Sequence, residues 1–193
     1  LTGMFVLALV ILIIFNFAID LSIENPEAIA PGILWVTVIF AGTIGIGRTL
    51  TVERDRGTLE GILLAPVDRG AIYLAKLSAN ALYMVLMEVI ATFFFAIISN
   101  LPIFKLELIP VAILGTIGYS AVGTLLSAMA AQSRARELML PILLFPISVP
   151  VIIATVQATA LVLKPGLEGP PWINLLIAYD VIFLVIAFWA FDR

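Results

Sequence analysis

The sequence predicts an all-α integral membrane protein with six transmembrane helices and a short amphipathic cytoplasmic helix between the second and the third. Hydrophobic residues make up 63% of the 193 residues and charged residues only 12%, whereas a soluble domain is nearer half apolar and a quarter charged. The apolar residues gather in runs of about 20, the length that a helix needs to cross ~30 Å of hydrocarbon. The Lys and Arg residues gather in alternate breaks between these runs.

Six apolar runs can be read as spans, and they form a single transmembrane domain over residues 1–193. They cover approximately residues 3–19, 30–50, 71–99, 109–131, 138–163 and 172–191. The first run has no basic segment before it and no small-residue cleavage site after it, so we interpret it as a span and not as a signal peptide. Pro31 suits the first position of the second helix, whereas Pro141, Pro146 and Pro150 should kink or break the fifth.

The distribution of positive charge orients the chain. With six spans, the breaks 52–70 and 132–137 lie on the same side of the membrane as the C-terminus. That side has eight Lys and Arg residues: Arg48, Arg54, Arg56, Arg69, Lys76, Arg134, Arg136 and Arg193. The other side has two, Lys105 and Lys164. Because cytoplasmic loops carry the excess of positive charge, we expect both termini and the 52–70 break to be cytoplasmic.

The composition excludes several kinds of site. The chain has no Cys and no His, which removes disulfides, Cys-ligated metals, the commonest metal ligand and a triad built on His. It has no GxxxxGK[ST] sequence and therefore no P-loop for a nucleotide. We expect no catalytic residue, no metal site and no cofactor bound by this chain. If the protein uses ATP, another chain hydrolyses it.

The break at 52–70 has the sequence VERDRGTLEGILLAPVDRG. Gly57 can end the preceding helix, Thr58 can cap a short new helix, and Pro66 stops it; Asp68 can cap the next span. The apolar residues of the short helix share one face, at spacings of three and four: Leu59, Ile62 and Leu63. Such a helix either lies passively in the lipid interface or presents a ridge to a cytoplasmic partner, and the pattern alone leaves both open.

Two acidic residues form a candidate intramembrane polar site. Glu88 lies well inside the third span, and Asp180 lies eight residues after Trp172, ~12 Å along the sixth helix. Ionisable groups at that depth are costly and are candidates for function; otherwise they fix helix packing as neutral or hydrogen-bonded groups. The polar residues that we consider as their partners are Asn80, Tyr83, Gln157 and Tyr179.

Three further patterns bear on packing. Glycines gather in the second and fourth spans, where they either permit close helix contact or reflect ordinary membrane-helix composition. Met84 and Met87 share a face with Glu88, and packing explains them best. The three Trp residues fit anchoring at the membrane interface: Trp35, Trp172 and Trp189.

The segment ERDRGTLEGILLAPVDRG, residues 53–70, resembles the hallmark of ABC-2-type exporter permeases. In that superfamily an acidic-basic run, Gly-Thr-Leu-Glu and a downstream Pro lie between the second and third spans. The segment is the coupling helix that docks on the ATPase subunit, so the resemblance favours the second role of the break. It assigns ATPase coupling to Glu53, Arg54, Asp55, Gly57, Thr58, Leu59, Glu60, Leu63 and Pro66.

A narrower resemblance, over most of the chain, is to the CcmB family of haem exporter permeases. Residues 30–67 are similar to its central signature, residues 140–154 (LPILLFPISVPVIIA) to its Pro-punctuated fifth span, and residues 178–192 (AYDVIFLVIAFWAFD) to its last span. That family has six spans and a cytoplasmic segment before the first, so we expect further residues to precede Leu1.

The resemblance implies the membrane half of an ABC transporter for c-type cytochrome biogenesis in the bacterial inner membrane. The implied partners are a CcmA-like ATPase with its ATP and Mg, CcmC-like and CcmD-like subunits, the haem chaperone CcmE indirectly, and a second copy of this chain; nucleic acid is not among them. Haem is the implied candidate substrate. Without His or Cys this chain lacks the usual axial ligands of haem iron, so haem would cross against apolar side chains or be ligated by a partner.

Three alternatives remain open at this point. The first is an ABC-2 exporter of a lipid, polysaccharide or drug. The second is a scaffold that holds haem-handling subunits together without transport. The third is a proton-coupled carrier that uses Glu88 and Asp180, which the absence of an obvious inverted repeat in the sequence disfavours.

Overall fold

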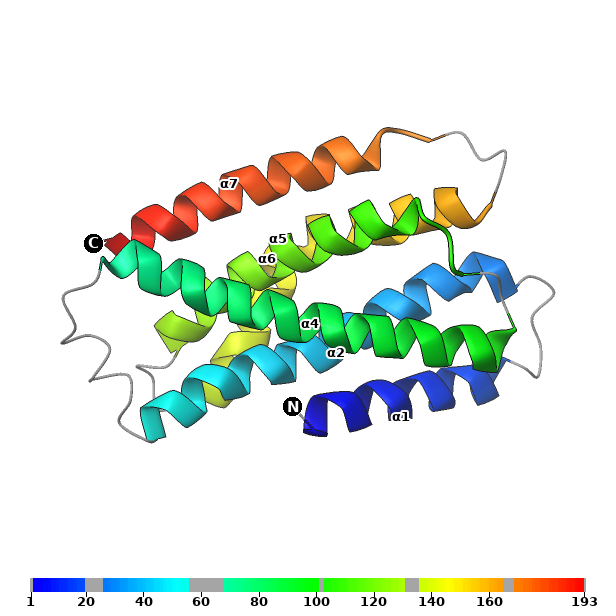
Figure 1. Cartoon of the computed structure of the whole chain (residues 1–193), viewed down its shortest axis with the longest axis horizontal. Coiled ribbons are helices and arrows are strands. Elements are labelled where there is room, and N and C mark those ends of the chain that lie inside the picture. Colours follow the sequence, from blue (N-terminus) through cyan, green and yellow to red (C-terminus); the bar gives the residue numbers. More distant parts are fainter. Residues whose placement is uncertain are drawn as a thin grey trace.

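The computed structural model describes residues 2–19, 26–55, 68–100, 103–130, 136–164 and 169–192, which form an antiparallel bundle of long helices without a strand (Figure 1). The all-α class predicted from the sequence is therefore confirmed for the described residues. The helices are α1 (Thr2–Ile19), α2 (Pro26–Asp55), α4 (Arg69–Ser99), α5 (Leu108–Ala130), α6 (Arg136–Leu163) and α7 (Trp172–Asp192).

Five of these helices are long and apolar enough to cross a membrane, which makes the chain a multi-pass membrane protein. Their candidate spans are Ala28–Thr49, Arg69–Ser99, Leu108–Ala130, Leu138–Leu163 and Trp172–Phe191. The apolar part of α1, Thr2–Ala18, is shorter, and in Figure 1 α1 begins near the middle of the bundle and runs to one end. The first of the six predicted spans, residues 3–19 in α1, thus stays a prediction.

Pro31 and the three prolines of the fifth span lie inside helices that they do not break. α2 begins at Pro26, and Pro31 lies inside it, so the assignment of Pro31 to the helix start is wrong. α6 runs unbroken from Arg136 to Leu163 through its three prolines, so the fifth span is not broken. Prolines are tolerated in membrane helices because neighbouring helices and local backbone adjustments satisfy the carbonyls that they leave unpaired.

The two ends of α4 are closed by backbone geometry. Asp68 occupies the N-cap position, as predicted, but its side chain makes no capping bond. Its carbonyl oxygen instead accepts hydrogen bonds from the backbone N–H groups of Ala71 (3.1 Å) and Ile72 (3.2 Å). At the other end Asn100 adopts a left-handed conformation with φ 53° and ψ 29°, which stops the helix, as Asn does at some helix C-termini.

The helix ends alternate between the two ends of the bundle (Figure 1). One end has the C-terminal ends of α2, α5 and α7 and the N-terminal ends of α4 and α6. The helices that flank the breaks 52–70 and 132–137 therefore reach the same end as the C-terminal helix. The count of Lys and Arg residues on each side of the membrane assumed this same arrangement.

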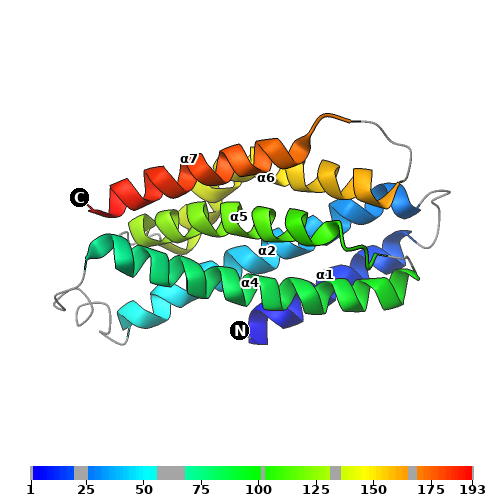
Figure 2. The ribbon, with the colours of Figure 1, turned by 45° about the horizontal axis from the view of Figure 1, so that its top comes forward.

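α5 is the central helix of the bundle. It contacts α2, α4, α6 and α7, and in both ribbon views it lies between α4 and α7 (Figure 2). Its glycines let side chains of the neighbouring helices approach its backbone: a Cβ added at Gly115 would lie 2.7 Å from the Trp35 ring, and one at Gly123 would lie 2.8 Å from Ile46. Of the two explanations of the glycine clusters, close helix contact is therefore the correct one here.

We expect Gly115→Ala to destabilise the bundle by about 1–3 kcal/mol, the usual cost of overpacking. The added methyl would meet Trp35, whose indole N–H is fixed by a 2.9 Å hydrogen bond to the Thr159 hydroxyl. The measurement is the free energy of unfolding in mixed micelles titrated with SDS. Gly32→Ala is the matched control, because a Cβ there meets nothing within 4 Å. Equal stabilities of the two variants would contradict the tight packing of α5.

Candidate functional site

Buried side chains, all polar except Met84, form hydrogen bonds between α4 and α5 in a regular series, which we call the polar ladder. It uses every fourth residue of each helix, and because the helices are antiparallel the numbers rise on one as they fall on the other. Its three pairs are Asn80 with Thr124 (2.9 Å), Met84 with Ser120 (3.3 Å) and Glu88 with Thr116 (2.7 Å). All six side chains are buried, so the ladder fixes both the register and the rotation of α4 against α5.

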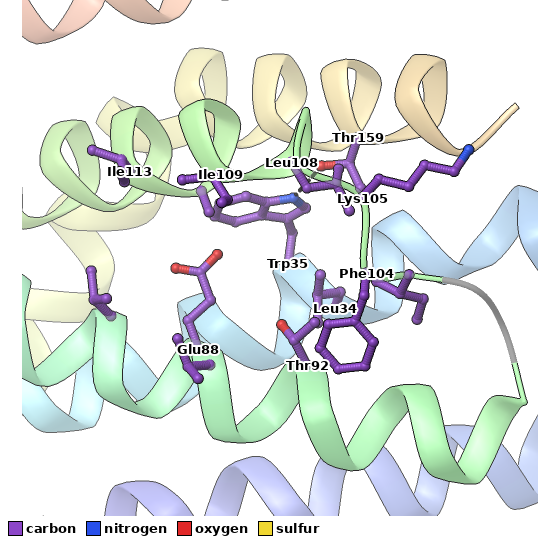
Figure 3. A pocket seen from close by; sticks show the side chains of 14 residues that line it. Leu34, Trp35, Glu88, Thr92, Phe104, Lys105, Leu108, Ile109, Ile113 and Thr159 are labelled. Atoms are coloured by element: carbon purple, nitrogen blue, oxygen red, sulfur yellow. Dashed lines mark hydrogen bonds between the residues drawn. The ribbon is translucent and has the colours of Figure 1, made fainter. Parts of the chain in front are cut away.

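Glu88 lies at one end of the polar ladder and also on the wall of a cavity. The Thr116 hydroxyl donates to its Oε2 atom, and the side chain is only 5% exposed. In Figure 3 the carboxyl group points from α4 toward the indole of Trp35. The cavity has a volume of about 430 Å³ and is lined by residues from α2, α4, α5, α6 and the link between α4 and α5.

Asp180 lies on α7 and faces the other side of α5. It is 5% exposed, and a Cβ added at Gly118 would meet its Oδ1 atom. Both carboxyl oxygens are buried and have no hydrogen-bond partner among the residues that the structure describes. A buried carboxyl without a partner is costly, so Asp180 destabilises this arrangement of the helices.

The structure does not bring Glu88 and Asp180 together. Their neighbours on α5, Thr116 and Gly118, are two residues apart, which corresponds to a rotation of roughly 200° and a rise of ~3 Å on an α-helix. The two acids thus lie at almost the same level on opposite faces of α5. The candidate intramembrane polar site therefore consists of two separate positions, and a direct relay between the two carboxyl groups is absent from the described residues.

The partners expected for these acids are largely wrong. Asn80 bonds to Thr124, and the Tyr179 hydroxyl donates to the carbonyl oxygen of Ile147 at 3.1 Å. Tyr83 and Gln157 are exposed. The true partner of Glu88 had a signal in the sequence that our interpretation missed: small hydroxyl residues recur in the fourth span at spacings of four, four and three, at Thr116, Ser120, Thr124 and Ser127.

A second set of polar contacts joins α2 to the core. Trp35 is 3% exposed and bonds to Thr159, so its assignment to the membrane interface is wrong. Trp189 is 57% exposed, so its predicted position at the membrane interface is compatible with the structure. The hydroxyls of Thr43 and Tyr119 lie 2.6 Å apart in a hydrogen bond between α2 and α5. Met84 and Met87 are buried in the same core, which confirms their role in packing.

The residues assigned to ATPase coupling lie mostly outside the described residues. Glu53, Arg54 and Asp55 form the last positions of α2. The others fall within 56–67, which is not described: Gly57, Thr58, Leu59, Glu60, Leu63 and Pro66. Their role and the short helix stay predictions. Among the described residues no group of three acidic side chains is placed to hold a metal ion.

The sequence of the whole chain matches a known family. The family model described as "CcmB protein" matches residues 1–193. The chain belongs to the CcmB family. This CcmB family member aligns with most of the length of three relatives described as Heme exporter protein B. It is 27% identical to the Rhodobacter capsulatus protein over 162 residues, 83% of this chain and 72% of the relative.

The other two relatives give similar values. Identity to the Bradyrhizobium diazoefficiens protein is 26% over 180 residues, 92% of this chain and 81% of the relative. Identity to the Pseudomonas aeruginosa protein is 24% over 163 residues, 84% of this chain and 71% of the relative. The predicted resemblance to CcmB is therefore confirmed, and it covers the polar ladder, the cavity and Asp180.

We expect a measurable coupling between Glu88 and Thr116. In a double-mutant cycle with Glu88→Leu and Thr116→Val, the interaction energy should be about 0.6 kcal/mol and at most about 1.7, the range of hydrogen bonds between membrane helices. The free energy of unfolding in SDS-containing micelles measures it. The pair Tyr83→Leu and Thr116→Val serves as the control, since Tyr83 is exposed. Strict additivity of the first pair would contradict the contact.

We expect Asp180→Leu to stabilise the bundle by about 1–3 kcal/mol, because an apolar group of the same shape removes two unsatisfied polar atoms. The measurement is again unfolding in mixed micelles. Asp180→Asn is the control that keeps the polar atoms, and its stability should stay near that of the wild type. A loss of stability in Asp180→Leu would show that the carboxyl group has a stabilising partner.

Proposed function

We propose that this protein is the membrane permease subunit of an ABC transporter complex that handles haem for c-type cytochrome biogenesis, driven by a separate ATPase subunit. The observation that carries the proposal is the family match over residues 1–193, together with relatives named Heme exporter protein B that align over 71–81% of their own length. In this proposal the chain is not itself an enzyme.

The arrangement of the helices supports an orientation with the 52–70 break in the cytoplasm of a bacterial inner membrane. The helices that flank this break and the 132–137 break end at the same end of the bundle as α7. Eight of the ten Lys and Arg residues belong to that side, which matches the positive charge of cytoplasmic loops. Both termini are then cytoplasmic, and the ATPase subunit, CcmA-like, docks on this end.

The coupling mechanism follows from what the break connects. Residues 52–70 join α2 directly to α4, and α4 is held to α5 by the polar ladder. α2 is held to the same core where Met84 packs against Gly42. A movement of the break by the ATPase subunit therefore displaces two helices of the core together. The ATPase must bind one arrangement of these helices more tightly than the other for ATP to drive the change.

Haem in this proposal is substrate and not a resident cofactor. The chain has no His and no Cys, which are the usual axial ligands of haem iron. Haem that passes through it is therefore held by apolar and small side chains, or its iron is ligated by a partner such as the CcmC-like subunit. The CcmD-like subunit, the haem chaperone CcmE and a second copy of this chain complete the proposed assembly.

We expect Glu60→Lys and Gly57→Pro to abolish holo-cytochrome c formation. The first reverses a charge of the coupling motif, and the second removes the backbone freedom that ends the preceding helix. The measurement is a haem stain of membranes from cells that lack this gene and express each variant, with co-purification of the ATPase subunit as a second readout. Lys164→Glu, a charge reversal at the opposite end of the bundle, is the matched control and should complement fully.

The deletion strain separates this function from its alternatives. Normal cytochromes in cells that lack the gene would overturn the role in haem handling and favour an exporter of another substrate. Normal cytochromes with a catalytically dead ATPase subunit would favour a scaffold without transport. Full activity of Glu60→Lys and Gly57→Pro, with unchanged ATPase binding, would overturn the coupling role of the 52–70 break.

A further inference from the structure

The cavity beside Glu88 is open toward the outside of the bundle between α4 and α5 (Figure 3). Its volume of about 430 Å³ is within the range of small-molecule sites. The apolar residues of its rim are exposed on the surface that a membrane helix presents to lipid: Val89 is 62% exposed, Phe104 70% and Ile109 50%. The cavity is thus continuous with the lipid-facing surface of these two helices.

Trp35 forms the inner wall of the cavity. Its indole N–H is already used in the hydrogen bond to Thr159, so the ring offers the cavity an apolar surface. Trp35 lies nine residues after Pro26 on α2, or ~14 Å along the helix. That depth corresponds to the acyl chains of a bilayer and not to its headgroups.

Lys105 supplies a positive charge at the outer end of the cavity. It lies in the link between α4 and α5, at an end of the bundle. Its Nζ atom donates to the carbonyl oxygens of Val162 (2.8 Å) and Leu163 (3.3 Å) in the last turn of α6. An ammonium group has three donors, and two are used in these bonds. The ammonium group is therefore anchored at the membrane end of an otherwise mostly apolar cavity.

We propose that this cavity binds one acyl chain of a membrane phospholipid. The phosphate group lies beside Lys105, and the chain runs inward past Phe104 to the face of Trp35. This proposal does not depend on haem export, since it concerns a lipid site on the permease itself.

Two properties of the cavity favour this ligand. Its charge and its apolar surface are arranged along the membrane normal in the same order as in a phospholipid, with the cation at the bilayer surface and the apolar wall below it. At the inner end, the Thr116 hydroxyl donates to Oε2 of Glu88, and Oε1 is the carboxyl oxygen that remains toward the cavity. Apart from Glu88, Thr92, Lys105 and Thr159 the lining is apolar, so most of the cavity lacks the two to four polar partners that a bound water needs.

Trp35 provides a direct test through fluorescence quenching. A variant with Trp172→Phe and Trp189→Phe keeps Trp35 as its single Trp. It is reconstituted in phosphatidylcholine vesicles with or without bromine atoms at the middle of the acyl chain, which quench an indole that they contact. Because Trp35 is 3% exposed, its ring has almost no contact with lipid outside the bundle, and the cavity is the large opening that leads to it in the described residues. We expect Trp35 to lose most of its fluorescence in the brominated vesicles.

Matched variants test whether the quenching of Trp35 takes place in the cavity. Ala112→Phe fills the cavity, which Ala112 lines, and should restore most of the fluorescence; Lys105→Gln should reduce the quenching in part. Ala190→Phe, at an exposed position of α7, is the control and should leave it unchanged. A chain with Trp189 alone, 57% exposed, reports that the vesicles quench a lipid-facing Trp.

Several outcomes would overturn the lipid site. Trp35 that stays unquenched while Trp189 is quenched, or quenching that Ala112→Phe does not change, would each do so. Hemin or a lipophilic cation that quenches Trp35 in unbrominated vesicles, with this effect lost in Ala112→Phe and no quenching by brominated lipid, would assign the cavity to that ligand instead. None of these outcomes affects the haem-stain test of the proposed function.

Discussion

The hydrogen-bonded contact between α4 and α5 is the constraint on which the rest of the bundle depends. Within a bilayer no hydrophobic force drives one helix against another, so packing of small residues and interhelical hydrogen bonds decide which faces meet. The polar ladder, with buried partners at every fourth residue from Asn80 to Glu88 on α4, fixes one face of α5. Because the helix is rigid, its other faces are then fixed as well: Gly115 meets Trp35 and Thr155, and Gly118 meets Asp180.

This geometry separates two acids that look equivalent in the sequence. Glu88 has a hydroxyl partner and a cavity beside it, so its carboxyl group is part of the helix contact and of a binding surface. Asp180 has neither, and its oxygens lie against α5 without a described partner. A group of that kind stabilises nothing in this arrangement of the helices.

Much of the fold could be predicted from the sequence, because the lengths of the apolar runs and the polar breaks between them can be read directly from the order of the residues. The predicted limits of the last four spans agree with α4, α5, α6 and α7 within two residues at each end. The contacts between helices could not be predicted, since they depend on the rotation of each helix. Trp35 suited the interface by residue type, yet its rotation on α2 points it at Thr159. Glu88 was identified as costly, but its partner lay in a hydroxyl stripe of α5 whose spacing we had not used.

The 52–70 break, proposed to couple to the ATPase, and the cavity, proposed to bind lipid, are connected by α2 and α4. α2 continues to Asp55, six residues beyond the apolar span that ends at Thr49, and thus extends ~9 Å toward the 52–70 break. From that break α4 runs back along the polar ladder to Glu88. Glu88 belongs to the last pair of the ladder and also lines the cavity. A shift of α4 along α5 by one turn would give two of the three pairs new hydroxyl partners and leave the third residue, Glu88 or Asn80, opposite Ala112 or Ala128. Registers one turn apart therefore keep two of the three hydrogen bonds and intermediate registers keep none, and a helix pair with discrete registers of this kind suits the two-state coupling proposed above.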